Sequence, residues 1–336
     1  MRKISGILAA SALVASIALV APAAYANETI TGSGSSYMNS FQQTCIGDYT
    51  AHKVTYASKG SGTGKTEFSN GVTNFGGSDS LYSPDSRPAN YTYVPLVGGP
   101  IGITYNVKGL TSLRLTPELL DGIFTGKIKK WNAAPIKALN PAAKLPNAKI
   151  QVVYRADTSG TTNNFGNYMK QTVGKTWKAA DAWADAVGIS PVGTSARTNQ
   201  GVITTVSTLA NSITYADTAD AKAAKLRFAS VRNGMNQFVQ PTVAAAAKFL
   251  GRQTLASNGE LIIDHKAKIS GGYNISLIAY GMAPTKSSNP AKAAAVKDYF
   301  TYIINTCGPQ TAAAGSYVAV SGPLKAKALE LIARIK

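Results

Sequence analysis

Val152-Val153-Tyr154-Arg155-Ala156-Asp157-Thr158-Ser159-Gly160-Thr161-Thr162 passes from an apolar pair to a polar, glycine-containing segment. We interpret the valines as the end of a buried strand and the residues from Asp157 onward as the start of a helix. A helix N-terminus exposes unpaired N–H groups and the positive end of its dipole, which attract anions. Arg155 adds a permanent charge. The stretch predicts either an anion-binding site or an ordinary helix start, capped by Asp157 or Ser159.

The segments before this stretch alternate between strand-like and helix-like patterns. The first three predicted strands each lead into a polar loop that contains glycine: Gly32 to Tyr37, Gly60 to Gly64, and Gly76 to Asp79. This alternation is typical of an α/β sheet, in which ligands bind beyond the carboxyl ends of the strands. The sequence therefore predicts an α/β fold with these loops around a ligand.

Other segments carry strand or helix patterns of their own. Tyr93 to Val97 and Ile101 to Val107 are rich in strand-forming residues, and Gly98-Gly99-Pro100 separates them. Gly201 to Ala210 predicts a helix, and Ser212 to Tyr215 a strand. We therefore expect strand structure on both sides of residue 100 and one helix–strand unit after residue 200.

Residues 1–26 are typical of a secretory signal peptide. Arg2 and Lys3 precede an apolar run from Ile7 to Val20, and Ala24-Tyr25-Ala26 is a small-x-small cleavage site. The run is too short to predict a stable membrane span. Because no cysteine lies at the cleavage site, we expect no lipid anchor and place the mature protein in the periplasm.

Charge and cysteine content limit the kinds of ligand and partner that we expect. The chain has 34 basic and 16 acidic residues and a net charge of +18, but the lysines are scattered, so we expect no nucleic-acid partner. Cys45 and Cys307 are the only cysteines, and an isolated pair in an oxidising compartment most often forms one disulfide. His52 and His265 lack metal-ligand spacing, so neither a metal site nor a cofactor is expected.

Catalytic motifs are incomplete in this sequence. The segment from Gly60 to Thr66 resembles a nucleotide P-loop, but Lys59 stands where the pattern requires glycine. No Gly-x-Ser-x-Gly elbow is present. An acid/base pair of Asp79 and Asp157 would lack the other groups that hydrolysis needs. The loops supply hydroxyls, N–H groups, one arginine and one carboxylate, which favours binding of an oxyanion, with no catalytic residues.

Several of these segments resemble, in order and spacing, the phosphate-binding protein of bacterial phosphate ABC importers. They are Gly32 to Tyr37, Gly60-Ser61-Gly62, Phe75 to Asp79, Arg155 to Thr161, Asp121 to Trp131, and Gly201-Val202 leading to Ser212 through Tyr215. The resemblance spans nearly all of the chain after residue 26. It implies a monomer that binds inorganic phosphate, delivers it to the membrane permease of the importer, and is not an enzyme. The alternatives are an exported phosphate-ester enzyme or a polyanion-binding secreted protein on the same scaffold.

The resemblance also implies the fold, a type II periplasmic-binding-protein fold with two doubly wound α/β lobes joined by two crossover strands. Residues 27–99 and 275–336 would form lobe one, and residues 100–274 lobe two, with the signal peptide at 1–26. Both cysteines would then lie in lobe one, which agrees with a disulfide between them.

The family's phosphate ligands map onto eight residues by motif: Ser36, Tyr37, Ser61 and Asp79 in lobe one, and Arg155, Ser159, Gly160 and Thr161 in lobe two. Asp157 would orient Arg155 without touching phosphate. The first loop has Ser36-Tyr37-Met38-Asn39 where the family usually has threonine, phenylalanine and a proline-containing continuation, and Gly62 stands where the family often has a serine. Asp79 would accept a hydrogen bond from a protonated phosphate, so we expect phosphate to be preferred over sulfate.

Overall fold

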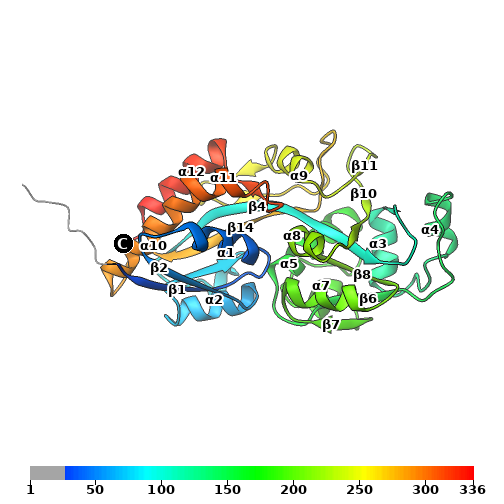
Figure 1. The fold of residues 1–336 in the computed structure, drawn as a ribbon, viewed down its shortest axis with the longest axis horizontal. Helices are drawn as coiled ribbons and strands as arrows, with labels where there is room; N and C mark the ends of the chain where they lie inside the picture. The colour runs from blue at the N-terminus through cyan, green and yellow to red at the C-terminus, as the bar shows by residue number, and fades with distance from the viewer. Residues whose placement is uncertain (1–26) are drawn as a thin grey trace, which may run out of the picture.

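The computed structural model describes residues 27–336, so the predicted signal peptide lies outside the described residues. The chain forms an elongated α/β molecule with two lobes (Figure 1). Lobe one contains β1 (Thr29–Gly34), β2 (Lys53–Ser58), β3 (Phe75–Ser78), α1 (Asn39–Asp48), α2 (Ser61–Ser69), α10 (Pro290–Tyr302) and α12 (Gly322–Ala333). Lobe two contains β6 (Gln151–Arg155), β7 (Thr194–Ala196), β8 (Ser212–Asp217), α3 (Pro117–Phe124), α4 (Ala134–Leu139), α5 (Gly160–Thr172), α6 (Trp183–Val187), α7 (Thr198–Thr208) and α8 (Thr218–Ala223).

One sheet path connects the two lobes, in the order β2-β1-β3-β14-β4-β8-β6-β7, where β4 is Tyr91–Asn106 and β14 is Ser276–Pro284. Strand β1 is parallel to β2 and β3, and β6 is parallel to β7 and β8. Parallel strands bring their carboxyl ends to one edge, so the loops that follow them meet there. The predicted α/β class and two-lobe fold are confirmed.

The two strand patterns around residue 100 belong to one strand, because β4 runs without interruption from lobe one into lobe two (Figure 1). The resemblance implies a crossing between the lobes at this place, near Gly98 to Ile101. The strand pairs with β14 as far as Pro100 and with β8 from Ile101 onward. Gly98 and Gly99 are extended here, and a methyl group at Gly99 would lie 2.4 Å from the Tyr37 hydroxyl. These glycines permit Tyr37 to pack closely on β4, between the two segments that the sequence predicts as strands.

The remaining elements are short or lie against the crossover. They are the 3₁₀ turn Pro84–Ser86, β5 (Arg114–Leu115), β9 (Arg227–Phe228), β10 (Ser230–Arg232), β11 (Phe238–Val239), α9 (Val243–Leu250), β12 (Thr254–Leu255), β13 (Leu261–Ile262), η2 (Ile303–Cys307), α11 (Gly308–Thr311) and β15 (Val318–Ala319). Phe249 and Leu261 pack with Tyr93 and Ile278, so the α9 segment contacts β4 and β14. The predicted lobe boundaries at residues 99 and 274 stay a prediction.

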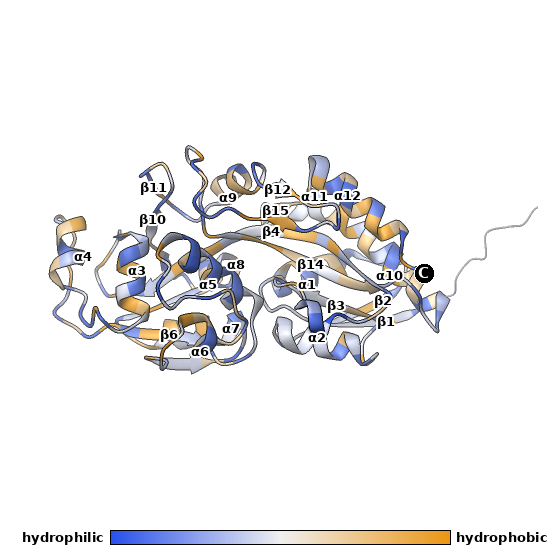
Figure 2. Ribbon diagram, turned by 180° about the vertical axis from the view of Figure 1, so that it is seen from behind, coloured by the Kyte–Doolittle hydropathy of each residue, from blue (hydrophilic) through white to orange (hydrophobic). Residues whose placement is uncertain are grey.

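Apolar side chains fill the space between the sheet and the outer helices. Helix α12, for example, carries hydrophobic and hydrophilic residues (Figure 2) and buries Ala328, Leu331 and Ile332. Cys45 of α1 and Cys307 of η2 are disulfide-bonded, with their Cα atoms 5.6 Å apart. The predicted disulfide is confirmed, and it joins the first helix of lobe one to the C-terminal helices that close the same lobe.

Candidate functional site

The lobe-two half of the site begins where β6 ends and α5 starts. Ser159 is the N-cap of α5, because its Oγ accepts a hydrogen bond of 3.1 Å from the Thr162 N–H. Of the two predicted capping residues, Ser159 therefore has this role and Asp157 does not. Gly160 and Thr161 form the first turn, whose N–H groups have no partner within the helix. This turn faces loops of lobe one.

Arg155 is the largest buried charge at the site, with 2% of its surface exposed. Its Nε donates to Asp157 Oδ1 at 2.8 Å, and its Nη2 donates to Asp157 Oδ2 at 2.5 Å. Burial would raise the pKa of Asp157, but the hydrogen bonds and charge of Arg155 hold it below its ordinary value. The remaining Nη1 of Arg155 is buried without a hydrogen-bond partner. A buried charged donor without a protein partner is suited to bind an oxyanion.

Asp79 is the buried carboxylate of the lobe-one half, in the loop after β3. Its Oδ1 accepts a hydrogen bond from Ser35 Oγ, and its Oδ2 accepts one of 3.0 Å from Thr161 Oγ1 in lobe two. Its N–H donates to Ser61 Oγ at 3.2 Å. Burial raises the pKa of Asp79 to about 6, although hydrogen bonds from Ser35 and Thr161 and the charge of Arg155 oppose this shift. The carboxylate therefore changes charge in an accessible pH range.

Ser36 and Tyr37 lie in the loop between β1 and α1. Ser36 Oγ accepts two hydrogen bonds from Asn199, one from its backbone N–H at 2.9 Å and one from Nδ2 at 3.0 Å. The Tyr37 N–H donates to Ser35 Oγ at 3.1 Å, and the ring of Tyr37 is buried. A methyl group at Gly160 would lie 2.6 Å from Ser61 Oγ, so only glycine fits this contact between the lobes. All eight predicted residues thus gather at one place.

Contacts across the cleft hold the two lobes together in this structure. Lys65 Nζ of α2 lies 2.7 Å from Asp181 Oδ2 of lobe two, and both side chains are largely buried. The Gly62 N–H donates to the Thr158 carbonyl at 3.0 Å, and a side chain at Gly62 would collide with Thr158. The departure from serine at Gly62 therefore agrees with a close approach of the lobes. The structure describes a closed arrangement.

Sequence reasoning missed Ser35, Lys65, Asp181 and Asn199. Ser35 directly precedes Ser36, a predicted phosphate ligand, so its place in the sequence could have indicated a role at the site. Asn199 lies two residues before Gly201, where the predicted helix was expected to begin, but α7 begins at Thr198. The parallel pairing of β7 with β6 brings this helix start to the same edge as Arg155. That placement depends on long-range pairing and has no local signal.

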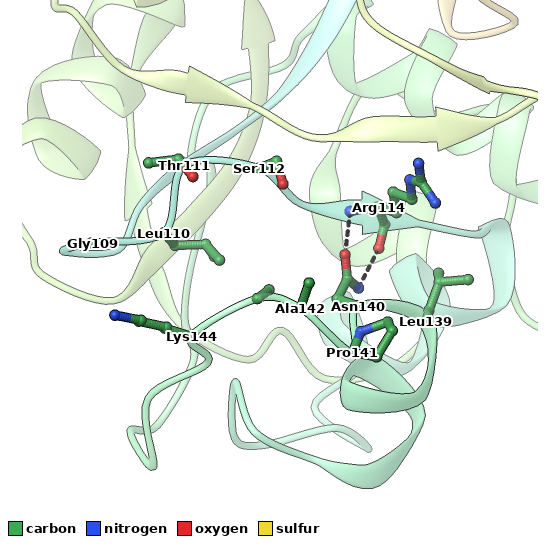
Figure 3. Close-up of a pocket in the computed structure, with 11 residues that line it drawn as sticks. Gly109, Leu110, Thr111, Ser112, Arg114, Leu139, Asn140, Pro141, Ala142 and Lys144 are labelled. Carbon is green, nitrogen blue, oxygen red and sulfur yellow. Dashed lines mark hydrogen bonds between the residues drawn. The ribbon is translucent and has the colours of Figure 1, made fainter.

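One cavity lies at the far end of lobe two, away from these residues. It has a volume of about 480 Å³ and is lined by the segments around Gly109–Arg114 and Leu139–Lys144 (Figure 3). Within residues 27–336, no group of three or more His, Cys, Asp or Glu side chains is arranged to hold a metal ion. No helix in the same range is long and apolar enough to cross a bilayer.

The fold and this interlobe site define a class of protein. A family model of the PBP superfamily domain matches residues 20–306, so the chain belongs to that superfamily. It is 33% identical over 284 residues to phosphate-binding protein PstS 3 of Mycobacterium leprae, covering 78% of this chain and 73% of that protein. It is also 33% identical over 286 residues to phosphate-binding protein PstS of Xylella fastidiosa, covering 81% and 76%. The chain is a member of the PstS phosphate-binding protein family, which confirms the resemblance seen in its motifs.

Two solved structures with bound phosphate share the fold. The periplasmic phosphate-binding protein PfluDING superposes with a TM-score of 0.74 at 23% identity, over 89% of this chain and 92% of that chain. A phosphate ABC transporter substrate-binding protein from Clostridium perfringens superposes with a TM-score of 0.66 at 16% identity, over 87% and 100%. At these identities the likeness establishes the two-lobe fold.

Proposed function

We propose that the protein binds inorganic phosphate between its lobes and delivers it to the membrane permease of a phosphate ABC importer. The observation that carries this proposal is the Nη1 of Arg155, a buried charged donor with no protein partner. Further donors at the contact between the lobes are the first-turn N–H groups of α5 and the hydroxyl of Ser36, which Asn199 links to Thr161. Such a set of donors suits a dehydrated oxyanion.

Asp79 supplies the selectivity in this proposal. A carboxylate among donors would repel a fully deprotonated oxyanion, but it accepts a hydrogen bond from the proton of a hydrogen phosphate. Sulfate has the same shape and no such proton at neutral pH, so it would give Asp79 no hydrogen bond and would bring a like charge against the buried carboxylate. This costs on the order of 1–3 kcal/mol, and more for a charged group.

We further propose that the protein is a periplasmic monomer, exported by a cleaved signal peptide and without a lipid anchor, and that it catalyses no reaction. The ligand residues are Ser36, Tyr37, Ser61, Asp79, Arg155, Ser159, Gly160 and Thr161, with Asp157 holding Arg155. The lobe boundaries at residues 99 and 274 belong to this proposal as well. No described residue favours the phosphate-ester enzyme or the polyanion-binding protein as a second function.

Calorimetric titration with phosphate and with sulfate tests the proposal directly. The protein is first stripped of bound ligand, and the released fraction is analysed for phosphorus. We expect tight binding of phosphate at one site per chain and much weaker binding of sulfate. Equal affinity for the two anions would contradict the phosphate assignment. Binding that collapses at moderate salt would point instead to the basic surface, because surface electrostatics are screened over about 10 Å.

A further inference from the structure

Asn199 is a buried residue that the predicted ligand set does not include. It lies in the first turn of α7 in lobe two, and none of its side chain is exposed. Its N–H and Nδ2 both donate to Ser36 Oγ of lobe one. Nδ2 also donates to Thr161 Oγ1 of lobe two at 3.2 Å. One asparagine therefore contacts hydroxyls from both halves of the site.

The surrounding chain fixes the orientation of this side chain. Asn199 Oδ1 accepts a hydrogen bond of 3.0 Å from the Asp217 N–H, which directs Nδ2 toward the cleft. Thr198 has a φ of 63°, a left-handed conformation that is rare for a β-branched residue. The turn points the Thr198 N–H at Asp157 Oδ1, at 3.0 Å, and the next N–H at Ser36. Backbone strain of this kind is concentrated at functional sites.

The hydrogen bonds to Ser36 determine whether its hydroxyl acts as a donor or as an acceptor toward a ligand. A serine hydroxyl has one proton to donate and two lone pairs to accept with. The two N–H groups of Asn199 occupy both lone pairs, so the single proton of Ser36 is left to donate. Ser36 belongs to lobe one and Asn199 to lobe two, so this arrangement exists only when the lobes are closed.

We propose that Asn199 is a positioning residue, which makes Ser36 an obligate hydrogen-bond donor to the bound oxyanion when the lobes close. This inference rests on the proposed function, because it assigns a role in phosphate binding to a residue outside the motif-derived ligands. The Thr161 hydroxyl also accepts from Asn199, but its proton is already directed to Asp79 by a hydrogen bond of its own. The effect of Asn199 on hydroxyl direction is therefore expected to act through Ser36.

A double-mutant cycle with phosphate calorimetry tests the inference. The variants are Asn199→Ala, Ser36→Ala and the pair together. We expect each single change to weaken phosphate binding roughly 10- to 100-fold. If Asn199 acts through Ser36, then Asn199→Ala in the Ser36→Ala background costs no more than about 2-fold further. Losses that multiply in the double variant would overturn the inference and leave the proposed function standing. A wild-type protein that binds no phosphate would overturn both.

Two further variants separate positioning from general damage. Asn199→Leu fills a similar volume without donors, so we expect it to lose affinity as Asn199→Ala does. Asn140 is a matched control: it is 7% exposed, lies far from the site, and makes two hydrogen bonds to the backbone of Arg114 (Figure 3). We expect Asn140→Ala to lower the melting temperature without changing phosphate affinity. An equal loss of affinity in Asn140→Ala would show a general effect and overturn the inference.

Discussion

The two halves of the site are built from different local structures. The lobe-two half uses a strand end, a capped helix and an arginine held by a neighbouring aspartate, all within the stretch from Val152 to Thr162. The lobe-one half uses three separate loops and a buried carboxylate whose pKa is raised. Under the proposed function, lobe two supplies attraction for oxyanions in general, and Asp79 of lobe one selects among them.

The largest effect is expected from replacing Arg155, which supplies the attraction for oxyanions in lobe two. Arg155→Met leaves Asp157 buried without its partner and deletes the unpaired Nη1 donor. Truncating one partner of a buried, hydrogen-bonded charge pair weakens binding by about 2–5 kcal/mol, so we expect phosphate and sulfate affinity to fall together by roughly 30- to 4,000-fold. Calorimetry measures both anions. Arg114→Met, at an exposed arginine at the far end of lobe two, is the control and should change neither affinity.

Removing the selecting carboxylate is expected to have a smaller and different effect. In Asp79→Asn the amide donates as well as accepts, so a fully deprotonated oxyanion no longer faces a negative charge. We expect the preference for phosphate over sulfate to fall roughly 10- to 100-fold, mainly because sulfate binds better. Competition titration measures the ratio. A variant that retains the full preference would remove Asp79 from its proposed role.

The preference for phosphate over sulfate is also expected to depend on pH. Burial raises the pKa of Asp79 to about 6, so the carboxylate is charged above this pH and protonated below it. A protonated carboxyl donates a hydrogen bond to sulfate. We therefore expect discrimination against sulfate to be greatest above about pH 6 and to decrease as the pH falls through this value. Sulfate titrations across this range give the result, and Asp79→Asn should show a flat profile.

The strand end and the helix start of the lobe-two half could be predicted from the sequence because their signals are local. A strand end, a serine cap and an arginine two residues before an aspartate all lie within one short stretch. The disulfide could be predicted for a different reason, because the sequence contains only two cysteines. Both inferences needed no knowledge of long-range contacts.

The parts that sequence reasoning missed depend on distant partners. Gly98-Gly99-Pro100 separates two strand patterns in the sequence, yet it lies inside β4, where it pairs with β14 from far away in the sequence. Asn199 reaches Ser36 across 163 positions of sequence, through a left-handed turn at Thr198 that no residue preference predicts. These features arise from the pairing of whole strands and lobes, which a single sequence does not specify locally.

The smallest effect is expected at the edge of the cleft, where the two halves meet outside the ligand site. Lys65 and Asp181 form an ion pair of 2.7 Å across the cleft, and Ser80 also donates to Asp181. Because such pairs contribute about 0.2–1 kcal/mol when partly exposed, Lys65→Met should speed phosphate release by roughly 2- to 5-fold. Stopped-flow release experiments measure the rate.

A matched control for this change lies in the same helix region. Lys59 pairs with Glu67 at 2.7 Å within lobe one, so Lys59→Met removes a similar pair that does not cross the cleft. If closure of the lobes depends on the Lys65–Asp181 contact, only Lys65→Met changes the release rate. High salt should then speed phosphate release from the wild-type protein and reduce the difference between it and Lys65→Met. Equal effects of the two variants would mean that general loss of positive charge, and not contact between the lobes, governs release.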